Sequence, residues 1–490
     1  MNILKILTAK ALAAMVMLCL LLSVVSCSDD GPDDNGGSSG GSTEAEGPDV
    51  SANAPDRGIH TLRAPLYWSV YERCWLMERQ GIPGDKMDIT ADQWDEIINW
   101  MAVEMLPYGY NMLCTDGFIS MHVDSPDGIY LERYGSMPLA DLVKRCKAKG
   151  LKLGVYDNPL WIHCPNERIV PGTNVSVGSL RYQPGSDKVV HSSASDTWFH
   201  WIVASHQGAK EYIDGFFKHY HDLGVDFIRV DFLSWYEDGN DRGMGTVGRG
   251  YGRDCYELAL KYMCESATKY GIFLSLVMPH CYKSAELEAK YGHMFRIVRD
   301  TAAGGWDFCS NSDRRLSYGN WPNCNNQFDG FVYWSKVAGR GSVIMDGDFT
   351  RLNTFENDAQ KESEISLQLM AGGPIAIADQ PSTIGNNARF YQNSELLALN
   401  ADRFAGRPLA ASLIDNNNQI WYGQMRNGDW VVGFFNRDAV NKSFSLKFSS
   451  LGLSGTFKIR DLWRHADEGA ADHLDVTLNP YACKIVRLSK

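Results

Sequence analysis

The sequence predicts an α/β fold, in which a (β/α)8 TIM barrel is followed by a C-terminal antiparallel β-sandwich. From about residue 60, short apolar runs alternate with amphipathic stretches, a pattern typical of parallel strands joined by helices. After about residue 400 the helical patterns stop, and short alternating runs continue to the C-terminus. We therefore expect the barrel at 57–397 and the sandwich at 398–490.

The first 56 residues precede this pattern and predict export. A Lys-bearing start, an apolar run from Ala11 to Val25 and small residues before Cys27 are typical of a signal peptide, expected at 1–26. The apolar run is shorter than the roughly 20 residues of a membrane span. The ending SVVSC resembles a lipobox, which implies a lipidated Cys27, and SDD after it resembles the export tag of Bacteroides-type surface lipoproteins. An ordinary signal peptide with an incidental cysteine is the alternative.

Residues 27–56 are rich in Gly, Ser and acidic side chains, so we expect a flexible tether. The predicted location is the outer membrane, at the cell surface, with the periplasmic face as the alternative. Contact with the membrane is then expected through the lipid anchor only.

The composition of the chain argues against some classes of binding partner. The net charge of −12 and the lack of a basic, aromatic-interleaved stretch argue against nucleic acid. Ten cysteines follow residue 27, without a C-x-x-C pair or a Cys/His zinc spacing, and His219 and His221 face different sides of a predicted helix. No metal and no cofactor are therefore predicted. The many aromatic side chains suit sugar rings and protein cores equally well.

Eight strands alternate with helices in the barrel segment. The helix at 90–106 has Thr90 as its expected N-cap, and the helices at 137–150 and 209–224 each end in glycine. Eight such units closing on themselves make a barrel. The strands are predicted at 62–69, 110–117, 151–158, 225–232, 272–280, 294–301, 341–348 and 373–380.

Two further segments complete the organisation. The run 419–438 is split by Asn427–Gly428, a strong hairpin signal, and short strands follow to the C-terminus. Exposed tryptophans of this region (Trp421, Trp430 and Trp463) would bind glycans or pack in strands equally well. The insertion at 159–206, with Trp161, Trp198 and Trp201, is too long for an ordinary loop, and we expect it to wall the active site.

Reacting groups in such barrels stand at the C-terminal ends of strands. Asp231 and Asp300 end the fourth and sixth strands, so their side chains are expected to face each other across a sugar. Two carboxylates are what glycosidic bond cleavage requires, one as nucleophile or base and one as acid. Carboxylates at strand ends also serve as helix caps or ion-pair partners, which leaves each position open. The strand ends carry Asp116, Asp157, Asp231, His280, Asp300, Asp346 and Asp379.

Short motifs in the expected order carry a family resemblance. GVDFIRVDF resembles the nucleophile strand of glycoside hydrolase family 27, the α-galactosidase family, and FRIVRD resembles its R-x-x-x-D segment. YWSVYERCW, NMLCTDG, GLKLGVYDN and SLQLMAGGPIAIADQ resemble four more of its segments. The resemblance covers roughly residues 60–490 and includes the terminal sandwich.

The resemblance implies roles for named residues. Asp231 would be the nucleophile and Asp300 the acid/base, with Phe295 and Trp306 as apolar neighbours that raise the pKa of Asp300. Arg229 and Arg296 would keep the nucleophile ionised, and Arg299 would point away from the site. The expected substrate-binding residues are Asp116, Tyr156, Arg229, Arg296, Tyr71, Trp161 and His280.

Departures from the family pattern affect sugar recognition. Asp116 is followed by Gly117 where the family has paired aspartates, and the fifth strand ends without an acidic residue. Tyr71 replaces a tryptophan, and Arg229 a lysine. The sequence therefore predicts the reaction class better than it predicts which sugar is the substrate.

Four functions follow as hypotheses. The first is a retaining, exo-acting α-galactosidase that acts on an oligosaccharide or polysaccharide. A β-L-arabinopyranosidase and an α-glucan hydrolase of the isomaltodextranase type are alternatives in the same family. A non-catalytic surface glycan-binding lipoprotein is the alternative of another class, against which both carboxylates argue.

Overall fold

The computed structural model describes residues 62–79, 88–116, 128–181, 200–241, 245–246, 250–311, 324–338 and 343–490. The predicted signal peptide, Cys27 and the tether fall outside these residues, as do Gly117 and Trp198. Lipidation, location and the domain boundaries stay predictions. None of the described helices is both long and apolar enough to span a membrane.

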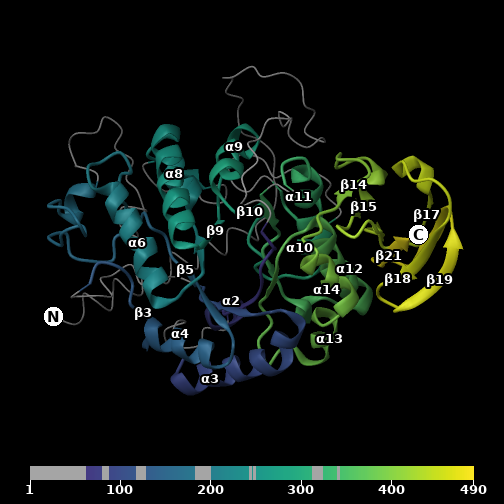
Figure 1. Ribbon diagram of the computed structural model, residues 1–490, viewed down its shortest axis with the longest axis horizontal. Coiled ribbons are helices and arrows are strands. Elements are labelled where there is room, and N and C mark those ends of the chain that lie inside the picture. Colours follow the sequence, from purple (N-terminus) through teal and green to yellow (C-terminus); the bar gives the residue numbers. More distant parts are fainter. Residues whose placement is uncertain are drawn as a thin grey trace.

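A nine-stranded parallel sheet and the helices around it form the larger part of the molecule (Figure 1). All eight predicted strands are present, which confirms the barrel. The sheet order is β11-β10-β9-β6-β5-β2-β1-β13-β12, and its two end strands are separated by only two residues of chain, so the seventh strand closes the ring. The strands are β1 (Leu66–Ser69), β2 (Met112–Cys114), β5 (Lys152–Tyr156), β6 (Phe227–Val230), β9 (Phe273–Leu276), β10 (Met294–Arg296), β11 (Ile344–Asp346), β12 (Phe349–Thr350) and β13 (Ile375–Ile377).

Local signals set the helix ends. Thr90 and Gln93 form a reciprocal capping box at the start of α3, and Gly224 ends α6 at a φ of 89°. The described helices are α2 (Tyr71–Arg79), α3 (Ala91–Trp100), α4 (Leu139–Ala148), α6 (Ala209–Leu223), α7 (Leu233–Glu237), α8 (Arg253–Tyr270), α9 (Tyr282–Tyr291), α10 (Trp306–Ser310), α11 (Gln327–Trp334), α12 (Asp358–Ala371), α13 (Ala388–Tyr391) and α14 (Ser394–Ala401). Two short hairpins accompany them, β3 (Arg133–Tyr134) with β4 (Met137–Pro138) and β7 (Asn240–Asp241) with β8 (Gly245–Thr246).

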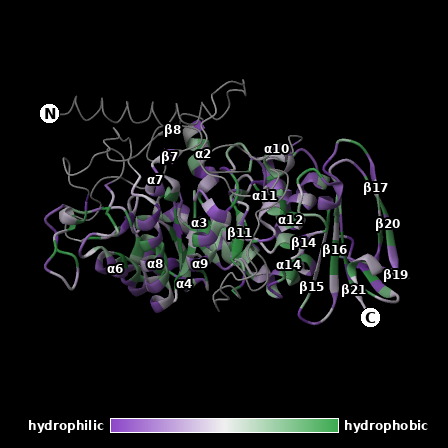
Figure 2. Cartoon of the chain, turned by 90° about the horizontal axis from the view of Figure 1, so that it is seen from above, coloured by the Kyte–Doolittle hydropathy of each residue, from purple (hydrophilic) through white to green (hydrophobic). Residues whose placement is uncertain are grey.

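The C-terminal strands lie at one end of the long axis in both views (Figures 1 and 2). A six-stranded antiparallel sheet has the order β14-β15-β16-β21-β18-β19, and β17 pairs with β20. The predicted hairpin is confirmed, because β15 and β16 pair across a turn in which Gly428 has a φ of 96°. The strands are β14 (Arg407–Pro408), β15 (Ile420–Gln424), β16 (Trp430–Phe435), β17 (Lys442–Lys447), β18 (Phe457–Asp461), β19 (Ala466–Ala471), β20 (His473–Leu478) and β21 (Cys483–Ser489).

The interior of the barrel changes from apolar to charged along the strands. Phe227, Met294 and Ile344 belong to one apolar cluster inside the ring, and Figure 2 shows hydrophobic ribbon around β11. Successive side chains of a strand alternate between faces, so the residue two positions further on points the same way. Those next positions are Arg229, Arg296 and Asp346, all buried. The sequence period thus places a charged layer above an apolar floor.

Candidate active site

Asp231 follows β6 directly and is held by its neighbours. The Tyr156 hydroxyl donates to Asp231 Oδ2 at 2.7 Å, and the backbone N–H of Phe232 donates to Oδ1 at 2.6 Å. Asn158 Nδ2 donates to the backbone oxygen of Asp231 at 2.7 Å. Phe232 adopts a φ of 61°, a left-handed conformation that is uncommon for a non-glycine residue. These contacts fix the carboxylate directly after the end of β6.

Opposing effects set the protonation of Asp231. Burial raises the pKa of the Asp231 carboxyl, the positive charge of Arg296 lowers it, and the negative charge of Asp300 raises it again. The hydrogen bonds from Tyr156 and Phe232 lower the pKa further. The charge of Arg296 therefore acts on both carboxylates, on Asp231 at a distance and on Asp300 through a direct ion pair.

Asp300 lies on the exposed side of this group. Its Oδ1 is 2.6 Å from Nη2 of Arg296, and its side chain is 55% exposed. Of its two expected apolar neighbours, Phe295 packs edge-on against Trp334 and Trp306 contacts Tyr481, and contact of either ring with Asp300 stays a prediction. Arg296 contacts the carboxylate, and the charge of Asp300 also acts on Tyr71 and Arg299.

Two arginines and two further carboxylates form the floor of the site. Arg229 Nη1 is 2.8 Å from Asp346 Oδ2, and its Nη2 is 2.7 Å from Asp348 Oδ1. Arg296 Nη1 is 3.3 Å from the same Asp348 oxygen. We expected both arginines to act on Asp231, but the structure ties Arg229, which is 1% exposed, to Asp346 and Asp348. Arg296 is the arginine whose charge reaches Asp231.

Asp348 is the residue of this floor that the sequence interpretation missed. Its Oδ2 accepts hydrogen bonds from the backbone N–H of Thr301 at 2.7 Å and from the Thr301 hydroxyl at 2.9 Å, so both of its oxygens are used. It has a φ of 68° in the break between β11 and β12. The signal was an Asp-Gly-Asp sequence at a strand end, of which only the first aspartate was considered. The side chain orients Arg296 and the segment that leads from Asp300.

Asp116 and Tyr71 reach the same group from β2 and α2. Asp116 is buried, with Oδ2 3.9 Å from Nε of Arg229. The Tyr71 ring stacks on Phe349 at a centroid distance of 4.4 Å, and its hydroxyl accepts from the Ala302 N–H at 3.0 Å. Burial and the charge of Asp300 raise the pKa of the Tyr71 hydroxyl, so it is a neutral donor near the acid.

Trp161 and His280 occupy supporting positions. The Trp161 ring is 2% exposed and lies against Trp201 and Phe232, each at a centroid distance of 6.0 Å. His280 is buried, with Nε2 2.9 Å from Asp238 Oδ1 and its ring stacked on Tyr282 at 4.8 Å. Direct contact of either ring with a sugar stays a prediction. The described ends of the insertion pack behind Phe232.

Two other strand-end aspartates have structural partners. Asp157 Oδ1 is 3.0 Å from His163 Nε2, and Asp157 Oδ2 accepts from the Tyr220 hydroxyl at 2.6 Å. Asp379 accepts the N–H groups of residues 352 and 353 at 2.9 and 3.0 Å, and burial raises its pKa to about 6. The alternative of caps and ion-pair partners thus describes these two positions. Among the described residues, no cluster of three or more His, Cys, Asp or Glu has the arrangement of a metal site. Arg299 Nε donates to the Asn325 oxygen at 2.7 Å, while burial lowers the pKa of its guanidinium and the charge of Asp300 raises it, so the expectation that Arg299 lies away from the site stays a prediction.

Known proteins share this architecture. Residues 415–488 match the family described as alpha galactosidase C-terminal beta sandwich domain. The chain is 35% identical to isomalto-dextranase of Arthrobacter globiformis over 87% of its own length and 67% of that protein. It is 25% identical to an α-galactosidase of Oryza sativa subsp. japonica over 72% of its length and 69% of that enzyme.

Solved structures agree with these sequence matches. The A. globiformis T6 isomalto-dextranase in complex with panose superposes with a TM-score of 0.79, over 88% of this chain and 73% of that one. A β-L-arabinopyranosidase of Geobacillus stearothermophilus has the same fold, with a TM-score of 0.61 at 18% identity, over 87% of this chain and 97% of that one. The chain is therefore an O-glycosyl hydrolase and belongs to the α-galactosidase family of glycoside hydrolases, which includes isomalto-dextranase.

Proposed function

We propose that the protein is a retaining exo-glycoside hydrolase whose substrate is a dextran-type α-glucan. The observation that carries the substrate is the 35% identity to isomalto-dextranase over 87% of the chain, compared with 25% identity to the rice α-galactosidase. The second candidate is release of terminal α-galactosyl residues, the first hypothesis from the sequence. It is supported by the match of residues 415–488 to an α-galactosidase domain. A β-L-arabinopyranosidase is the third.

In the proposed mechanism, Asp231 attacks the anomeric carbon and Asp300 protonates the departing oxygen. Attack breaks the glycosidic bond and leaves the sugar covalently attached to Asp231 Oδ. Water then attacks the same carbon while Asp300 removes its proton, which restores both carboxyl groups and retains the anomeric configuration. The exposed position of Asp300 suits both proton transfers, because its side chain is 55% exposed.

The surroundings of Asp231 suit a nucleophile. Tyr156 and Phe232 donate to its two oxygens, which fixes the carboxylate and reduces its reorganisation before attack. The charge of Arg296 lowers the pKa of the Asp231 carboxyl and so opposes the rise that burial causes, which favours the carboxylate form. The floor carboxylates Asp346 and Asp348 balance the arginines, so the site remains negative where positive charge develops on the sugar ring.

Replacing Tyr156 by phenylalanine is expected to move the acidic limb of the kcat/KM pH profile to higher pH. The Tyr156 hydroxyl lowers the pKa of Asp231, and its loss raises that pKa. Because the nucleophile acts as a carboxylate, a higher pKa means that activity is lost at a higher pH when the solution is acidified. Tyr256→Phe is the matched control, since it removes a buried hydrogen bond of 2.8 Å to Glu288. An acidic limb that stays in place in Tyr156→Phe would contradict the role.

Replacing Asp300 by alanine is expected to lower kcat/KM by about 10²-fold on α-glucan, the low end of general acid catalysis, because water reaches this exposed position. Aryl glycosides with acidic leaving groups need no protonation and should lose much less. The measurement is the dependence of kcat/KM on leaving-group pKa. Asp307→Ala, at an exposed position of α10, is the control. Equal losses on all leaving groups would exclude Asp300 as the acid.

The substrate is tested by hydrolysis of dextran, panose and the aryl α-galactoside, α-glucoside and β-L-arabinopyranoside. Turnover of dextran without turnover of the galactoside is the expected result. Galactoside turnover with intact dextran would establish the second candidate. The product anomer, followed by NMR during the first turnovers, should have the configuration of the substrate. An inverted product would exclude the double displacement.

A further inference from the structure

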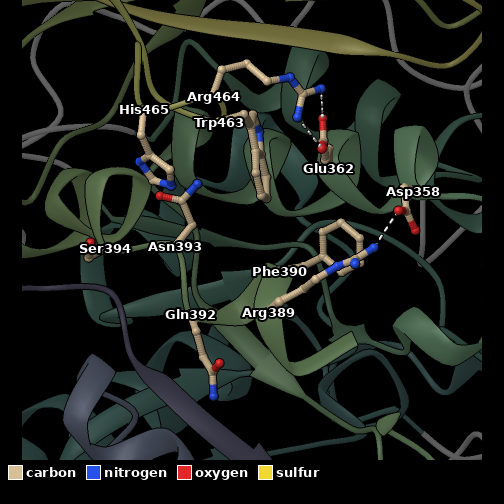
Figure 3. Close-up of a pocket in the computed structure, with 10 residues that line it drawn as sticks. All are labelled: Asp358, Glu362, Arg389, Phe390, Gln392, Asn393, Ser394, Trp463, Arg464 and His465. Carbon is tan, nitrogen blue, oxygen red and sulfur yellow. Dashed lines mark hydrogen bonds and ion pairs between the residues drawn. The ribbon is translucent and has the colours of Figure 1, made fainter. Parts of the chain in front are cut away.

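A pocket of about 440 Å³ lies where the barrel meets the C-terminal sheet, and neither Asp231 nor Asp300 is among its lining residues (Figure 3). Its walls come from α12, from α13 and the start of α14, and from the turn between β18 and β19. The volume is within the range of small-ligand sites. It is lined by Asp358, Glu362, Arg389, Phe390, Gln392, Asn393, Ser394, Trp463, Arg464 and His465.

Trp463 is the half-buried aromatic wall of this pocket, and it is fixed in place. Its indole N–H donates to the Ser366 hydroxyl at 2.8 Å, and its ring meets Phe390 at a centroid distance of 6.1 Å and an angle of 65°. The carboxylate of Asp461 accepts the N–H groups of Trp463 and Arg464, both at 2.9 Å. Asn393 Nδ2 donates to the Leu462 oxygen at 3.0 Å. The tryptophan therefore loses little freedom when a ligand binds.

The charges of the pocket are already balanced. Arg464 binds both oxygens of Glu362, at 3.0 and 3.1 Å, and Arg389 lies 2.5 Å from Asp358 (Figure 3). Two arginines of the lining thus match two of its carboxylates. A charged ligand would have to break one of these pairs. A neutral ligand with many hydroxyl groups gains hydrogen bonds from the same groups without doing so.

We propose that this pocket is a second carbohydrate-binding site, which takes a short neutral segment of the α-glucan chain. The face of Trp463 packs on the C–H face of a pyranose ring, and the two ion pairs and Gln392 bind its hydroxyls. One site holds the polymer while the other cleaves it, so the effective concentration of chain ends at Asp231 rises. The choice of glucan rests on the proposed function. The presence of a second site does not.

The test is affinity electrophoresis of the full-length Asp231→Asn protein in gels that contain dextran. Retardation is expected, and Trp463→Ala in the same background should weaken it by about tenfold or more, the loss that follows removal of a central aromatic contact. Trp430→Ala is the matched control, because that half-buried tryptophan lies in the C-terminal sheet against Tyr422 and outside the pocket. Arg389→Ala, at a side chain that is 59% exposed, is a second variant that leaves the fold intact.

The outcomes separate the two proposals. Unchanged retardation in both Trp463→Ala and Arg389→Ala, or no retardation by any polysaccharide, would overturn the second site. Retardation by galactomannan instead of dextran, lost in Trp463→Ala, would support the site and overturn the choice of glucan. In the active protein, Trp463→Ala should raise KM for dextran and leave aryl-glycoside hydrolysis unchanged. A loss of aryl-glycoside activity would mean that the substitution perturbs the barrel.

Discussion

Replacing Asp231 by asparagine is expected to lower kcat by about 10⁴-fold or more, the loss seen when a covalent nucleophile is removed. Asparagine keeps the shape of the side chain. Its oxygen can accept from the Phe232 N–H while its amide nitrogen donates to the Tyr156 hydroxyl oxygen, so the fold and substrate binding should change little. The measurement is kcat and KM on an aryl glycoside of the accepted sugar. Asp226→Asn, at an exposed position of the same segment, is the control and should retain activity.

Azide makes this test specific for the chemistry. In Asp231→Gly, azide occupies the vacated space and attacks the anomeric carbon, which should restore turnover and give a glycosyl azide of inverted configuration. In Asp300→Ala, azide should intercept the sugar on Asp231 and give the retained configuration. If Asp231→Gly gave the azide of retained configuration and Asp300→Ala the inverted one, Asp300 would be the nucleophile and Asp231 the acid. If azide restored no turnover in Asp231→Gly although Asp231→Asn still bound dextran in the gel, the assignment of Asp231 as nucleophile would be contradicted.

Replacing Asp348 by alanine is expected to destabilise the protein by about 3–5 kcal/mol, the cost of removing one partner from a buried ion pair. Asp348 has no exposed surface, and it contacts Arg229, Arg296 and both donors of Thr301. Its loss leaves two buried guanidinium groups with fewer acceptors. Because the positive charge of Arg296 also lowers the pKa of Asp231, displacing Arg296 should reduce the activity of the protein that remains folded.

Urea unfolding followed by tryptophan fluorescence measures this effect. Asp95→Ala is the matched control, because its ion pair with Arg145 has side chains that are 47% and 36% exposed, and such pairs contribute less than about 1 kcal/mol. A loss of stability in Asp348→Ala no larger than in Asp95→Ala would show that Asp348 is dispensable for the charged layer. A loss of activity alone, with unchanged stability, would assign it to positioning only.

Much of the barrel could be predicted because its signals are local. Apolar runs of strand length, Thr90 as a helix cap and Asn427–Gly428 as a turn depend on residues that are neighbours in the sequence. The alternation of Phe227, Arg229 and Asp231 already places the latter two on the inner face of one strand. The resemblance to family 27 then identified the same pair of carboxylates.

The partners of these side chains could not be predicted in the same way. Asp157 and Asp231 both follow barrel strands, yet one is bound by His163 and Tyr220 and the other faces Arg296 by charge. Their positions at strand ends do not distinguish them, and only the resemblance of GVDFIRVDF to the family's nucleophile strand singles out Asp231. The packing of Phe295 on β10 against Trp334 on α11 could not be predicted for the same reason, since these residues are far apart in the chain.

By itself, the sequence determined the class of fold and the presence of two acids at strand ends, because periodicity and turn chemistry act over a few residues. Only the tertiary structure decided that Arg229 is bound by Asp346 and Asp348, that Arg296 pairs with Asp300 and acts on Asp231 through charge, and that Trp463 meets Phe390 at a second pocket. Burial and charge pairing depend on residues that are more than 50 positions apart in most of these contacts, and the physical reason is that pKa and ion pairing respond to distance in space rather than along the chain.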